Sequence, residues 1–60
     1  MIKIKRETLS DGSIVFNVHV SAMVVACESE AAAQRFADGV AELHNEYNVH
    51  DADIAVQFDY

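Results

Sequence analysis

SIVFNVHVSAMVVA, residues 13–26, is an apolar stretch whose side chains alternate between two faces. Ile14, Phe16 and Val18 begin an apolar face, whereas Asn17 and the histidine that follows it lie on the other. Alternation with a period of two is typical of a β-strand that buries one face. The sequence therefore predicts one long strand over residues 13–26, around which the remaining elements can be placed.

Residues 1–9 alternate in the same way and are joined to the long strand by residues 10–12, Ser-Asp-Gly. A two-residue loop would turn the lysines of the first strand onto the apolar face, because a slip of one residue flips every side chain. A three-residue loop closed by Leu9 and Ser13 keeps the apolar faces together. It also places Gly12 where this loop type needs a positive φ. The sequence predicts this hairpin register.

A helix is predicted next, opening at Glu28 and Ser29 and closing at Asn48. Its apolar residues recur at three- and four-residue steps. They are Ala32, Ala33, Phe36, Val40, Leu43 and Tyr47. Gly39 borders this face, and close approach to the sheet is the expected reason for a glycine there. Residues 51–60 alternate again and predict a last strand.

The predicted fold class is α+β, with element order ββαβ in a single domain over residues 1–60. One helix packs on a three-stranded antiparallel sheet with spatial order 2-1-3, reached by a right-handed crossover. A last strand parallel to the second strand and beside it is the alternative. Five residues are expected deep between helix and sheet. They are Val18, Phe36, Leu43, Ile54 and Val56.

The distribution of charge indicates which class of macromolecule the protein could bind. The net charge is −6, and residues 7–60 carry ten acidic residues against one basic residue, Arg35. Such a surface repels nucleic-acid phosphates and anionic membranes, so a basic protein is the expected macromolecular partner. A single cysteine, Cys27, and the absence of an apolar stretch of bilayer length favour a cytoplasmic protein.

The residues that carry chemistry show no catalytic or metal-binding pattern. His19, His44 and His50 do not match a known ligand spacing, although Asp51 and Asp53 follow the last of them. Cys27 precedes the helix, but no base that could activate its thiol is identifiable beside it. We expect no enzyme activity, no metal and no cofactor.

Two surface features remain as candidate sites. Acidic residues recur every four positions along one flank of the helix, and a second acidic group follows the helix. These predicted protein-binding residues are Asp38, Glu42, Glu46, Asp51, Asp53 and Asp59. The second feature is the uncharged end of the long strand, which the first strand is too short to cover. Met23, Val24 and Val25 form this predicted dimer edge.

The sequence thus favours a small, acidic, non-enzymatic protein-binding module. One such class of inhibitor presents carboxylates where the phosphates of a nucleic acid would lie on a partner. In size and charge alone, the chain is similar to small phage-encoded inhibitors such as anti-CRISPR proteins. The alternative is a homodimeric building block whose acidity serves solubility only.

Overall fold

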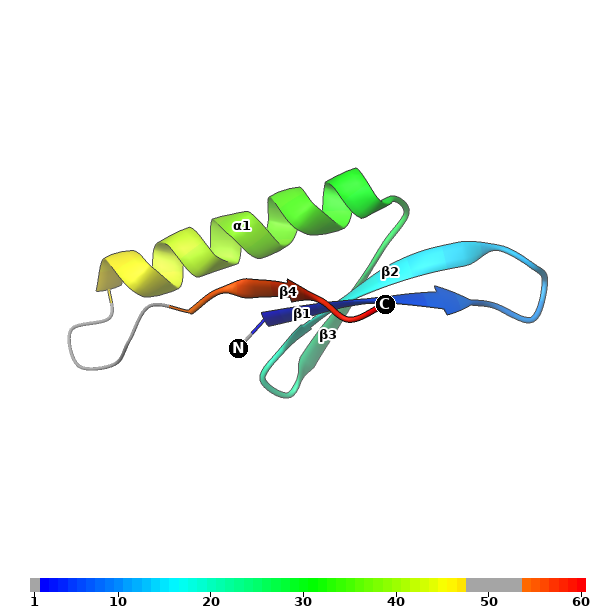
Figure 1. The fold of residues 1–60 in the computed structure, drawn as a ribbon, viewed down its shortest axis with the longest axis horizontal. Coiled ribbons are helices and arrows are strands. Elements are labelled where there is room, and N and C mark those ends of the chain that lie inside the picture. The colour runs from blue at the N-terminus through cyan, green and yellow to red at the C-terminus, as the bar shows by residue number, and fades with distance from the viewer. Residues whose placement is uncertain (1, 48–53) are drawn as a thin grey trace.

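The computed structural model describes residues 2–47 and 54–60, as a helix packed on one face of a mixed sheet (Figure 1). Its elements are β1 (Ile2–Thr8), β2 (Ile14–Val20), β3 (Met23–Cys27), α1 (Glu30–Tyr47) and β4 (Val56–Phe58). The sheet has four strands in the order β3-β2-β1-β4. The α+β class is therefore confirmed, whereas the predicted three-stranded antiparallel sheet of order 2-1-3 is wrong.

The hairpin of β1 and β2 has the predicted register. Ile4 pairs with Val18, and the loop is closed by the Leu9 amide, which donates to the Ser13 carbonyl at 2.7 Å. Gly12 has a φ of 89°, a conformation that L side chains rarely adopt. Apolar alternation and one well-placed glycine were sufficient to predict this pairing.

The predicted long strand is broken in two by a turn at Ser21 and Ala22. Ser21 has a φ of 54°, so the chain reverses and β3 runs back along the free edge of β2. Met23 pairs with Val20, and Cys27 pairs with Phe16 at the other end. A fourteen-residue strand would exceed the usual three to ten residues, and the turn shortens it.

This extra reversal determines the direction of the last strand. β4 lies beside β1, as predicted, but runs parallel to it, with Ile2 opposite Val56 and Ile4 opposite Phe58. Each hairpin inverts the chain direction once. Because the sequence analysis missed the hairpin at Ser21, it predicted an antiparallel last strand.

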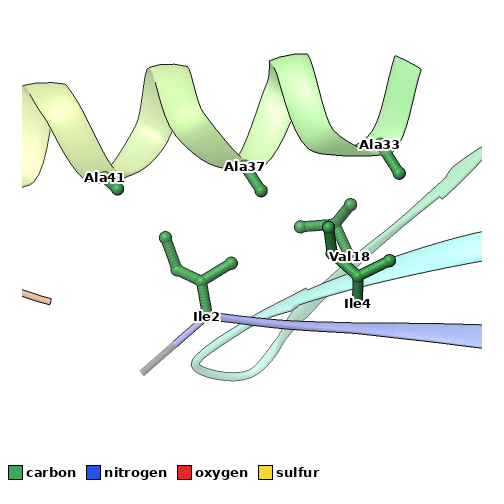
Figure 2. Close-up of a cluster of buried hydrophobic side chains, with 6 residues drawn as sticks. All are labelled: Ile2, Ile4, Val18, Ala33, Ala37 and Ala41. Atoms are coloured by element: carbon green, nitrogen blue, oxygen red, sulfur yellow. The ribbon is translucent and has the colours of Figure 1, made fainter. Parts of the chain in front are cut away.

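The core lies between three aliphatic side chains of the sheet and three alanines of α1 (Figure 2). Ile2, Ile4 and Val18 are almost completely buried on the sheet. The alanines recur every four residues along the underside of the helix. They are Ala33, Ala37 and Ala41. Small side chains at these positions allow the helix to approach the sheet closely.

The predicted apolar face of the helix is partly wrong. Phe36 and Val40 are only half-buried, and Leu43 and Tyr47 are 59% and 75% exposed. These larger side chains lie on a flank of α1 while the alanines face the sheet. Gly39 does not approach the sheet either, because a Cβ built on it would meet none of the described residues within 4 Å.

The molecule is elongated, measuring 44 × 17 × 17 Å. The tip of the β1–β2 hairpin extends beyond the start of α1, and the end of α1 extends beyond the sheet at the other side (Figure 1). Ser29 caps the helix as predicted, because its Oγ accepts the Ala32 amide at 3.1 Å. The predicted closing residue, Asn48, lies outside the described residues.

Candidate functional site

The candidate protein-binding site is the outer face of α1. Asp38, Glu42 and Glu46 lie about 100°, 140° and 180° around the helix axis from Ala37, which faces the sheet. All three carboxylates are therefore exposed, as the four-residue spacing predicted. We refer to these three residues as the acidic face.

The acidic face has no ionic partner among residues 2–47 and 54–60. The ion pair found there joins Lys5 to Asp59, with Nζ and Oδ2 3.7 Å apart. Arg35 lies one turn before Asp38 and is also exposed, without a salt bridge in that part of the chain. Like charges four residues apart cost a helix about 0.2–0.5 kcal/mol per pair. The acidic face carries that cost without an ion pair to offset it.

Of the second acidic group, Asp51, Asp53 and Asp59, the structure describes only Asp59. Asp51 and Asp53 lie outside the described residues, so their predicted role stays a prediction. Asp59 is exposed, but its carboxylate contacts Lys5 and its amide donates to the Ile4 carbonyl at 2.9 Å. It therefore holds the end of the chain on the sheet as well as adding negative charge.

Other acidic side chains are used within the fold. Asp11 accepts the Oγ and the amide of Ser13 at 2.6 and 2.9 Å, and these hydrogen bonds lower the pKa of its carboxyl group. Glu7 accepts the side-chain amide of the buried Asn17 at 2.7 Å. Neither contact was predicted. The contact between Glu7 and Asn17 depends on the pairing of β1 and β2, whereas the contact between Asp11 and Ser13 is local to the loop.

Tyr60 links the last segment of the chain to the start of α1. The Tyr60 hydroxyl donates to Glu30 Oε2 at 2.8 Å, and its ring packs edge-on against Phe16 and Phe58. The Arg6 guanidinium carbon lies 5.1 Å from the centre of that ring. Burial, and then the hydrogen bond to Glu30, raise the pKa of the Tyr60 hydroxyl.

Asn45 fixes the start of the final segment to the helix. Its side-chain oxygen accepts the Ile54 amide at 2.9 Å, and its side-chain nitrogen donates to the Ile54 carbonyl at 3.3 Å. The flank of α1 that carries Asn45 therefore faces β4. The opposite flank, which carries Leu43 and Tyr47, lies on the β3 side.

The described residues hold no candidate metal centre and no pocket. Cys27 is half-buried, with Sγ 3.9 Å from the Val25 carbonyl oxygen. His19 is half-buried on the open sheet face, and its Nε2 has no hydrogen-bond partner among the described residues. These two side chains are not part of any ligand cluster that the structure describes.

The predicted dimer edge, Met23, Val24 and Val25, forms most of β3. β3 covers the free edge of β2 and is itself the terminal strand of the sheet. Met23 and Val24 are half exposed, and Val25 is half-buried. The sequence predicted that these residues form the exposed edge of one long strand. In the structure they form a separate strand, which pairs with β2 and is the exposed edge of the sheet.

In residues 2–47 and 54–60, α1 is too polar to be a candidate membrane span. No protein-family model, curated protein or solved structure matches the chain.

Proposed function

We propose that the protein is a non-enzymatic binding module whose acidic face docks onto a basic surface of another protein. The observation that carries this proposal is the exposure of Asp38, Glu42 and Glu46 without an ionic partner among the described residues. The surface is a rigid one, because the underside of the same helix is packed on the sheet through its alanines.

The density of charge suits a site that otherwise binds nucleic acid. Three carboxylates at four-residue steps span about 12 Å of helix. One strand of DNA carries about four phosphates over that length. The acidic face would then occupy a nucleic-acid-binding groove and inhibit it, as phage-encoded inhibitors of the anti-CRISPR type do. The attraction would act over about 8–10 Å at physiological salt.

The test compares two variants with the same net charge. Asp38→Asn with Glu42→Gln neutralises two of the three carboxylates of the acidic face. Ser10→Lys with Ala55→Lys makes the same change of +2 at exposed positions off the helix. Each variant is used to capture proteins from the native host at low and high salt. We expect a basic protein whose capture is salt-sensitive, several-fold weaker with the first variant and nearly unchanged with the second.

The purified partner then allows a direct measurement. Nucleic acid should compete with this protein for the partner, and association should slow as salt rises. Equal binding by both variants and the parent at low salt would show that the acidic face serves solubility only. The alternative of a homodimeric building block would then stand as the function.

A further inference from the structure

A second surface combines the open edge of β3 with the flank of α1 above it, and we call it the β3–α1 side. Its strand edge is Met23–Cys27, which contains no charged residue, and Val24 is 52% exposed. Long apolar edges are a hazard that native proteins normally cover or charge. In the described residues this edge is neither covered nor charged.

The backbone of β3 is oriented for a further pairing. Val20 and Met23 close a two-residue turn, and such a closing pair exchanges hydrogen bonds. Hydrogen-bonded and non-hydrogen-bonded pairs alternate along an antiparallel ladder, so Val25 also bonds to β2. The amides and carbonyls of Val24 and Ala26 therefore face the open edge. They supply four hydrogen-bonding groups in one row.

The helix flank above this edge is apolar. Asn45 contacts the β4 side, so the residues on the other side of the alanine row face β3. Phe36 and Val40 are half-buried there, while Leu43 and Tyr47 are exposed toward the end of α1, which extends beyond the sheet. The acidic face occupies the outer part of the helix and not this flank.

We infer that the β3–α1 side is the contact between two copies of this chain. Two β3 strands would pair antiparallel around a twofold axis at Val25, continuing the sheet across both copies. Val24 then faces Ala26 of the second copy, and their outward backbone groups make four hydrogen bonds. Met23 faces Cys27 of the second copy, so each of the five strand residues meets an uncharged residue.

A second copy suits this side because the pairing is self-complementary. Beyond the paired strands, Glu28 falls opposite Ala22 of the second copy, so no carboxylates are opposed. A chain of net charge −6 repels its own copy, and an uncharged side minimises that repulsion. Both helices lie on the same face of the joined sheet, because the twofold axis is perpendicular to it.

The available area sets the expected strength. β3 has five residues, so the paired edge is about 17 Å long. A strip of that length and 17 Å high covers about 290 Å², against about 800 Å² per partner in a standard interface. The dimer is therefore expected to be weak, as small and transient interfaces are.

The first test is a designed crosslink in the full chain. Val25 faces its own copy in a non-hydrogen-bonded pair, where Cα atoms are about 4.5 Å apart and a disulfide can form. Val25→Cys with Cys27→Ser should give a covalent dimer on oxidation with diamide. The unmodified chain is the control, because its two Cys27 Cα atoms would be about 13 Å apart. Equal crosslinking of both proteins, or of neither, would overturn the proposed pairing.

The second test uses sedimentation over 1–500 µM. Val24→Pro removes an amide that faces solvent in the monomer, so folding should persist while the Kd rises tenfold or more. Val24→Ala shortens the same side chain but keeps the amide, and its Kd should stay within about threefold of the parent. A 6.6 kDa species at all concentrations of the parent, or a dimer that survives Val24→Pro, overturns the inference. A stable complex with a different protein through this side, instead of the dimer, would also overturn the inference.

Discussion

Replacing Gly39 by alanine should stabilise the monomer. Gly39 lies in the interior of α1 without a positive φ, and a Cβ added there meets no atom of residues 2–47 and 54–60 within 4 Å. The substitution therefore has no steric cost and recovers the helix propensity that glycine lacks, about 0.5–1 kcal/mol. For a domain of this size, 1 kcal/mol shifts the Tm by about 4–8 °C, so an increase of about 2–8 °C is expected.

The assay is thermal unfolding followed by circular dichroism, at a concentration below 1 µM so that self-association does not contribute. Ala37→Gly is the matched control in the same helix. It loses the same propensity together with a fully buried methyl group worth about 0.8 kcal/mol, so its Tm should fall. An unchanged or lower Tm for Gly39→Ala would refute the open space around Gly39.

Three further predictions concern the hairpin, the core and the C-terminal tyrosine. Gly12→Val should destabilise by about 1 kcal/mol or more in urea unfolding, because a β-branched residue resists the φ of 89°. Ile4→Val should cost about 0.5–1.5 kcal/mol in the same measurement, since Ile4 is completely buried. The raised pKa of Tyr60 means that folding favours its neutral form. Its contribution to stability is present below the ordinary pKa near 10 and is lost as pH rises through the folded value, and Tyr60→Phe should abolish this part of the pH dependence.

The sequence was sufficient to predict a hairpin where the apolar alternation and a glycine agreed. It was insufficient where a turn contained neither glycine nor asparagine. Gly12 marked the first hairpin, and its register followed from the apolar faces. The second hairpin turns on Ser21 and Ala22. Serine is a weak turn signal, and the φ of 54° at Ser21 is one that glycine or asparagine would favour. Only the excessive length of the stretch indicated a break. Because this break was missed, the direction predicted for β4 was also wrong.

Helix packing was mispredicted for a related reason. Large apolar residues such as Leu43 were taken as the buried face, because their period matches a helix. The helix instead rests on alanines, and burial follows the closest fit to Ile2, Ile4 and Val18 rather than side-chain size. The acidic face was predictable because its position depends only on the period of the helix. The contacts of Asn45 and Tyr60 depend on the sheet order, which the sequence did not supply.

The alanine row links the two proposed surfaces. Because small residues occupy the underside of α1, the larger apolar side chains are displaced toward β3 and the carboxylates toward the outside. The two surfaces therefore occupy different parts of one helix and do not compete. A twofold axis at Val25 runs perpendicular to the joined sheet, so it places both helices on one face. The two acidic faces would then point in the same direction. A dimer would present twice the charge to a basic partner, and simultaneous contact would raise the apparent affinity without any new kind of interaction.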